Sequence, residues 1–268
     1  MTVQENTPLL GLSPDKPSLL HRFKTHLTTE INPHKADLIL LFCYTITGIL
    51  DSSAVFIWGC FVSMQTGNTV YLGLGLSGLD DSGSQRWLKS LISISSFCLG
   101  SFFFSLLHHR LPFFQSPRDR GALALSFLLQ MVCVAIATGI VTATEQTKND
   151  NLSWKIGVPL ALVAFQSSGQ AVTSRVVGFS SLTSVVLTSV YCDLFSFPGN
   201  GAGFLEAFKN RDEWRRVGAV LGLFLGILLG GLWATSEVGS VVALWMAVLC
   251  KGGIVLAWLC WEGDERVE

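Results

Sequence analysis

Long apolar runs separated by short charged islands constrain this sequence more than any other feature. The runs span residues 36–57, 59–79, 87–107, 121–143, 155–174, 179–197, 215–234 and 239–261. A helix needs about 20 apolar residues to cross the hydrocarbon core of a bilayer, and most of these runs are that long. Only 14% of all residues are charged, whereas soluble domains average about 25%. The sequence therefore predicts an all-α fold, a polytopic transmembrane helix bundle formed by residues 36–261.

The two ends of the chain differ from this central region. Residues 1–35 are polar and basic with several prolines, so we expect a mostly disordered, cytosolic N-terminal tail. Residues 262–268 are expected to form a short polar C-terminal tail. Glu5, Leu9 and Leu10 match the acidic dileucine pattern that sorting adaptors bind. So short a pattern is as well explained by chance as by sorting.

Runs 59–79 and 179–197 differ from the other apolar runs. Both are rich in Gly, Ser and Thr, and each follows its predecessor almost without a break. Each is either a full helix in a tight hairpin, which gives eight spans, or a broken or re-entrant segment, which gives six. The Lys and Arg positions fit both counts nearly equally well. The sequon at Asn151 faces the lumen only in the six-span arrangement, which we slightly favour.

The order of features repeats in the two halves of the chain. A span with polar residues precedes each unusual run, and a span with small residues follows it. If each half crosses the membrane three times, the halves are inverted relative to one another. Inverted repeats with broken segments at their interface are the architecture of many secondary transporters. Coincidence among apolar sequences of low complexity is the alternative.

Two signatures carry a resemblance to a known family. The first comprises residues 48–52 and 61–70, and the second comprises residues 169–171, Arg175 and residues 186–194. Together they resemble the YoaK-like family of multi-pass membrane proteins (domain of unknown function 1275), in its fungal-type form, over residues 36–261. The resemblance implies a multi-pass membrane fold and little about activity. Bacterial members often carry a Thr-Gly pair where this chain has Thr188 and Ser189, which argues against two equivalent half-sites.

Ionisable and amide residues within the apolar runs are candidates for a functional site. Burying a charge such as that of Asp51 at the bilayer centre costs roughly 2.5–3.5 kcal/mol on insertion scales. We expect a central polar site lined by Asp51, Gln170, Arg175 and Asp193. A structural ion pair between Asp51 and Arg175 is the alternative.

Asp37 and Lys251 are predicted to be structural rather than functional. Each lies near the end of a span, or can extend its charged group toward the membrane surface.

The polar stretch in the second run is the best local candidate for a substrate contact. It consists of Gln65, Thr66, Gly67, Asn68 and Thr69, with Thr188 as its counterpart in the second half. A glycine allows the helix to break, and backbone groups exposed at the end of a half-helix bind ions or small polar solutes. A helix N-cap followed by a tight turn explains the same residues equally well.

Small residues form ridges on two further runs. Gly222, Gly226 and Gly230 recur at every fourth position, and Gly100 lies in the corresponding run of the first half. Such residues let helices approach closely. We expect them to serve internal packing rather than dimerisation.

Transport of a small solute or ion is the function that this architecture favours. A non-transporting scaffold, assembly factor or sensor is the alternative. We do not expect an enzyme, a metal site, a cofactor or nucleic-acid binding, because the sequence lacks the residue groupings that they need. The bilayer is the expected partner, in the plasma membrane or an endomembrane such as the vacuole. The sequence specifies neither the solute nor the oligomeric state.

Overall fold

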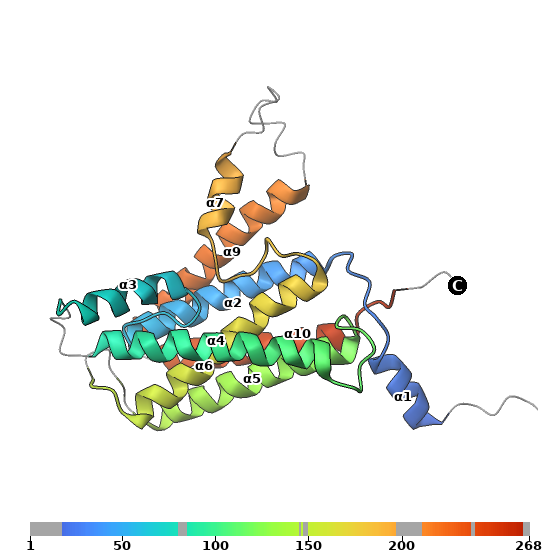
Figure 1. The fold of residues 1–268 in the computed structure, drawn as a ribbon, viewed down its shortest axis with the longest axis horizontal. Helices are drawn as coiled ribbons and strands as arrows, with labels where there is room; N and C mark the ends of the chain where they lie inside the picture. The colour runs from blue at the N-terminus through green and yellow to red at the C-terminus, as the bar shows by residue number, and fades with distance from the viewer. Residues whose placement is uncertain are drawn as a thin grey trace, which may run out of the picture.

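The computed structural model describes residues 18–79, 85–144, 146, 150–196, 211–236 and 239–264. These residues form an elongated all-α bundle, which confirms the predicted fold class (Figure 1). Apart from two isolated bridges, no β pairing occurs in these ranges. The bundle is built from long helices: α2 (Ala36–Ile57), α4 (Arg86–Arg110), α5 (Arg120–Ala143), α6 (Trp154–Val177), α9 (Arg211–Ala234) and α10 (Gly239–Leu259).

Most of the long helices have the composition of membrane spans. By length and hydropathy, α2, α4, α5, α9 and α10 qualify as crossing segments. Helix α6 is as long as these but does not reach their hydropathy, and its buried residues 166–170, four of them polar, lie between its neighbours. Burial within protein is where a spanning helix tolerates polar side chains. The described helices are therefore those of a multi-pass membrane protein.

The two unusual runs contain short helices. Helix α3 (Gln65–Leu76) has 12 residues and α7 (Thr188–Phe195) has 8. At about 1.5 Å per residue neither spans a hydrocarbon core of roughly 30 Å. Figure 1 shows α3 lying beside α4, with which it shares many contacts, while α7 packs on α9. Both runs therefore contain broken segments, as the fold prediction has it.

The N-terminal segment is more structured than a disordered tail over the residues that the structure describes. Helix α1 spans Leu19–Leu27, and the residues after it pair with two distant parts of the chain. The Ile31 amide donates to the Arg118 carbonyl (3.1 Å), and the Asn32 amide donates to that of Glu262 (3.0 Å). The sorting pattern Glu5, Leu9 and Leu10 lies outside the described residues.

Glycines bring two pairs of helices into close backbone contact. A Cβ atom at Gly226 of α9 would overlap the Thr45 carbonyl of α2, and one at Gly48 would overlap the Leu223 carbonyl of α9. At Gly100 of α4, a Cβ would overlap the Phe165 carbonyl of α6. The predicted ridge therefore lies at an internal helix contact. Gly230 also faces α2 closely, whereas Gly222 has slightly more room.

Candidate functional site

Asp51 binds the loop that follows its own helix. Its carboxylate accepts hydrogen bonds from the Val62 amide (2.8 Å), the Ser63 amide (3.0 Å) and the Ser63 hydroxyl. The side chain is buried and makes no ion pair with Arg175. The three donors compensate the carboxylate for its lost hydration, as a buried charge requires. Asp51 thus fixes the turn between α2 and α3.

Asn68 holds the same loop from the other side. Its amide nitrogen lies within hydrogen-bond distance of the Phe61 carbonyl (2.8 Å), Gln65 Oε1 (2.8 Å) and Ser93 Oγ on α4 (3.0 Å). Its amide oxygen accepts from the Phe61 backbone (3.0 Å). Gln65 also donates to the Val62 carbonyl (3.0 Å). Most of the polar groups of the first signature therefore bond to one another and to their own loop.

The other residues of this stretch do not point into a buried site. Thr66 and Thr69 are exposed, and the Thr69 hydroxyl donates to the Gln65 carbonyl of its own helix. Gly67 lies against the Phe61 ring, which a Cβ atom would overlap. Thr188, the first residue of α7, is also exposed. Their role in substrate binding stays a prediction.

Gln170 belongs to a second polar cluster, near the centre of the bundle. Its amide nitrogen lies within hydrogen-bond distance of Ser184 Oγ (2.9 Å), Thr47 Oγ1 (3.0 Å) and the Cys43 carbonyl (3.2 Å). Its amide oxygen accepts a hydrogen bond from Lys251 (2.8 Å). One side chain of α6 thus joins α2, α10 and the loop before α7.

Lys251 is the charged centre of this cluster, and its predicted position near the membrane surface is wrong. It lies near the middle of α10 and is fully buried. Its ammonium donates to Gln130 Oε1 on α5 and to Gln170 Oε1, each at 2.8 Å, and lies 5.4 Å from the centroid of the Phe127 ring. Within the described part of the chain no ion pair joins it to a carboxylate.

The structure separates the four residues that were expected to line one central site. Asp51 and Gln170 are buried in the two clusters described above, while Arg175 and Asp193 are exposed. Arg175 occupies the last turn of α6 and lines a groove at that end of the bundle. Asp193 on α7 forms an ion pair with Arg216 of α9 (3.9 Å).

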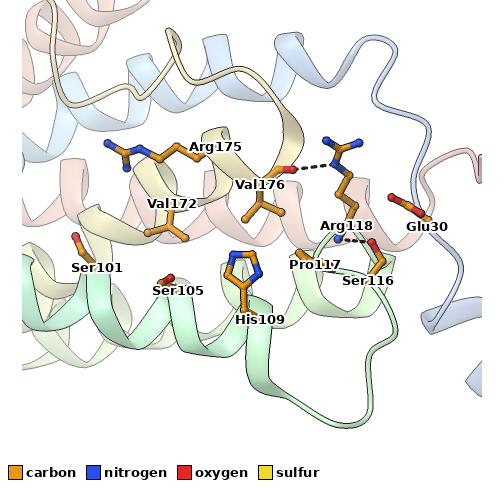
Figure 2. Close-up of a pocket in the computed structure, with 10 residues that line it drawn as sticks. All are labelled: Glu30, Ser101, Ser105, His109, Ser116, Pro117, Arg118, Val172, Arg175 and Val176. Carbon is orange, nitrogen blue, oxygen red and sulfur yellow. Dashed lines mark hydrogen bonds between the residues drawn. The ribbon is translucent and has the colours of Figure 1, made fainter.

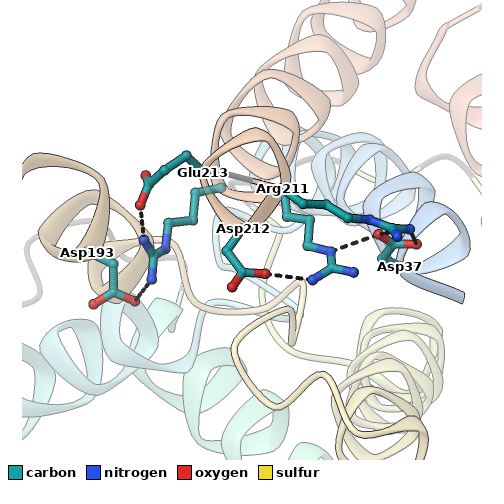
Figure 3. A network of polar contacts seen from close by, with 7 residues as sticks. Asp37, Asp193, Arg211, Asp212 and Glu213 are labelled. Atoms are coloured by element: carbon teal, nitrogen blue, oxygen red, sulfur yellow. Dashed lines mark hydrogen bonds and ion pairs between the residues drawn. The ribbon is translucent and has the colours of Figure 1, made fainter. Parts of the chain in front are cut away.

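An ion-pair network joins the beginnings of α2 and α9 (Figure 3). The buried Asp37 carboxylate accepts from Arg215 (2.7 Å) and Arg211 (3.2 Å), and Arg215 also pairs with Asp212 (2.6 Å). The Arg215 guanidinium lies over the Phe179 ring, 4.8 Å from its centroid. The predicted structural role of Asp37 fits these contacts, because they tie three segments together.

Sequence reasoning missed Gln130 and misjudged Lys251. A signal for both was present, since each is the one amide or charged residue of a long apolar run and lies near its middle. What the sequence did not supply was their proximity, because Gln130, Gln170 and Lys251 come from three helices far apart in the chain. Among the described residues, no group of three or more His, Cys, Asp or Glu side chains is placed to hold a metal ion.

One family of known proteins matches this chain over most of its length. The model of one protein family, described as "Protein of unknown function (DUF1275)", matches residues 39–257. No curated protein and no solved structure matches the chain. The match covers both signatures and all six long helices in whole or in large part.

Proposed function

The chain belongs to the protein family of unknown function DUF1275, and we propose from its own geometry that it transports a small solute or ion across a membrane. The observation that carries this proposal is the Lys251 cluster. A fully buried ammonium lies in the middle of an apolar helix, and uncharged amide oxygens are its hydrogen-bond acceptors.

The energetics of Lys251 favour a functional role over a structural one. A charged side chain at the bilayer centre costs roughly 2.5–3.5 kcal/mol on insertion scales. Two amide oxygens and an aromatic ring offset part of this cost, but they supply no opposite charge. A leucine in the same place would pack without such a cost. A buried cation with neutral partners is well suited to attract an anion or an anionic group of a solute.

The packing of the helices supports an inverted repeat around this cluster. Among the described residues, each half runs through a long, a short and two further long helices: α2 to α5 in the first half, and α6, α7, α9 and α10 in the second. The first long helix of each half packs against the third helix of the other, and the last helices, α5 and α10, pack together.

The glycines occur at corresponding places in these contacts. Gly226 of α9 lies against Thr45 of α2, and Gly100 of α4 lies against Phe165 of α6. Gln130 and Lys251 meet where α5 and α10 join, which is where a twofold axis relating the halves would pass. In transporters with inverted repeats, the binding site lies at such an interface near the bilayer midplane.

Transport is tested with the full-length protein reconstituted in liposomes. Solid-supported membrane electrophysiology would be recorded with a panel of small inorganic and organic anions, cations and sugars, and labelled uptake would be measured for neutral solutes. We expect at least one solute to give a signal that Lys251→Gln abolishes. Lys155→Gln is the matched control, because Lys155 is exposed in the first turn of α6. Equal amounts of reconstituted protein would be verified for all three samples.

The non-transporting alternative makes the opposite prediction. A scaffold or assembly factor would give no solute-dependent signal in the wild type. Lys251→Gln would then change only abundance or the recovery of copurifying proteins. Wild-type silence across the panel, together with normal folding, would overturn the transport proposal.

A further inference from the structure

A groove opens at the end of the bundle where α4 and α6 end (Figure 2). Its volume is about 630 Å³, and its lining includes Arg118, Arg175 and His109 together with serine hydroxyl groups. In Figure 2, Arg175 and Ser101 lie toward one end of the groove, Arg118 and Ser116 lie toward the other, and His109 lies between them. Glu30 is the one acidic residue in this lining.

The loop that carries Arg118 is held in place by its own contacts. Asp119 Oδ2 accepts from the backbone amides of Gln115 (2.8 Å) and Ser116 (3.2 Å). His108 Nδ1 lies 3.1 Å from the Pro117 carbonyl, and Arg118 Nε donates to the Val176 carbonyl at the end of α6 (2.9 Å). These contacts fix one guanidinium of the groove before any ligand binds.

Arg175 contributes the second guanidinium. In the described ranges, the guanidinium makes one hydrogen bond, from Nη1 to the Ala171 carbonyl of its own helix (3.2 Å). No ion pair joins it to a carboxylate in these ranges. An arginine side chain has five N–H donors, so most of those on Arg175 are available to a ligand. The planar guanidinium matches the geometry of phosphate oxygens.

Apolar surfaces next to the groove indicate that it meets lipid. The α4 residues Leu99 and Phe102, near Ser101, are 64% and 66% exposed. Helix α1 lies at the same end of the molecule, and its Leu19 and Leu20 are 83% and 82% exposed beside the basic residues of that helix (Figure 1). An exposed helix with apolar and basic residues is typical of the membrane–water interface.

We propose that this groove binds a phosphoryl group through the Arg175 guanidinium and serine hydroxyl groups of the lining, with Arg118 adding positive charge toward the other end of the groove. The adjoining apolar surface favours the headgroup of an anionic phospholipid as its source, with acyl chains lying along α4. A free phosphate compound would use the same donors. The proposal does not depend on the transport function, because the groove lies apart from Lys251.

Native mass spectrometry of the purified full-length protein tests this site. Phosphatidic acid, phosphatidylcholine and inorganic phosphate would each be titrated against the wild type and Arg175→Gln. Arg110→Gln is the control, because Arg110 is an exposed arginine at the same end of α4 and does not line the groove. We expect Arg175→Gln to weaken phosphatidic acid binding about tenfold, the loss of one charge-assisted hydrogen bond of roughly 1.4 kcal/mol. Arg110→Gln should bind like the wild type.

The two sources of phosphate give different results. Selective retention of phosphatidic acid over phosphatidylcholine, without displacement by millimolar phosphate, supports the lipid. Binding of inorganic phosphate that Arg175→Gln abolishes supports a free phosphate compound. Equal binding by Arg175→Gln and Arg110→Gln, for lipid and for phosphate, would overturn the proposal. Because Arg118 also donates a hydrogen bond to the end of α6, the second variant is Arg118→Lys, which keeps the positive charge. Size-exclusion profiles would verify that each variant is folded.

Discussion

At the scale of single residues, the buried polar side chains around Asp51 and around Lys251 form two groups with different partners. Asp51 and Asn68 bond to the backbone of the loop between α2 and α3, which explains their presence in an apolar sequence without invoking a ligand. Lys251 and Gln170 instead bond to side chains from several helices. The first group organises a local turn, whereas the second connects the two halves of the molecule.

The hydrogen bond between Lys251 and Gln170 leads to a prediction about thermal stability. Gln170→Leu removes one of the two acceptors of the buried ammonium, and an unsatisfied buried group costs about 1–3 kcal/mol, more when it is charged. We expect Gln170→Leu to lower the melting temperature in detergent more than the double variant Gln170→Leu/Lys251→Met does. A double variant that is no more stable than the single one would show that the two residues act independently.

Asn68 and Thr66 of the first signature give a second prediction at the scale of single residues. Asn68→Asp keeps the size of the side chain but removes the donors to the Phe61 carbonyl and Ser93, so it should lower thermal stability clearly. Thr66→Val changes an exposed side chain and should leave stability unchanged. Thermal unfolding measures both. A Thr66→Val variant that folds normally but loses transport would support the substrate-contact hypothesis for this stretch.

At the scale of helices, the glycine contacts decide how closely α2 and α9 approach. Gly226→Ala would force these helices apart, because its Cβ would overlap the Thr45 carbonyl, and such overpacking costs typically 1–3 kcal/mol. Gly231, also in α9, has open space around its Cβ position. Gly231→Ala should therefore be neutral or slightly stabilising, since alanine favours a helix. A comparison of the two melting temperatures tests this, and equal values would contradict the described contact.

The sequence predicted some helices better than others. The long apolar runs predicted the crossing helices because hydrocarbon leaves the backbone few alternatives to a helix. The short helices α3 and α7 were harder, since Gly-, Ser- and Thr-rich runs fit either a full span or a broken one. Helix α1 was missed because proline-containing polar sequence suggests disorder. Its neighbouring residues are ordered by pairing with segments about 90 and 230 residues away, which no local pattern reveals.

The candidate site was harder to predict from the sequence, because its residues also meet through contacts between distant parts of the chain. Lys251 in the last apolar run has no oppositely charged partner nearby in the sequence, so the sequence favoured a side chain that extends toward the membrane surface. Its environment depends on how α5, α6 and α10 meet, and that follows from the packing of the two halves. Arg175 was included in the central site as an ionisable residue within an apolar run, whereas its position in the last turn of α6 places it in the groove.

At the scale of the whole molecule, the number of crossings fixes which ends of the helices share a side of the membrane. The six long helices fit six spans, with α3 and α7 as broken segments. In that arrangement the loop at residues 111–119 lies on the same side as the N-terminus, and the loop around Asn151 lies on the opposite side. Eight spans would exchange the sides of these two loops relative to the N-terminus.

Labelling of single cysteines distinguishes these arrangements. Gln115→Cys and Asn151→Cys would be placed separately in a background whose native cysteines are replaced by serine or alanine, with an epitope tag at the N-terminus. Both positions are exposed in the structure. In sealed vesicles of one orientation, we expect a membrane-impermeant maleimide to label Gln115→Cys only where an antibody reaches the tag. Asn151→Cys should react only from the other side. Labelling of Asn151→Cys together with tag accessibility would instead require eight spans, and α3 and α7 would then have to extend beyond their described residues to cross.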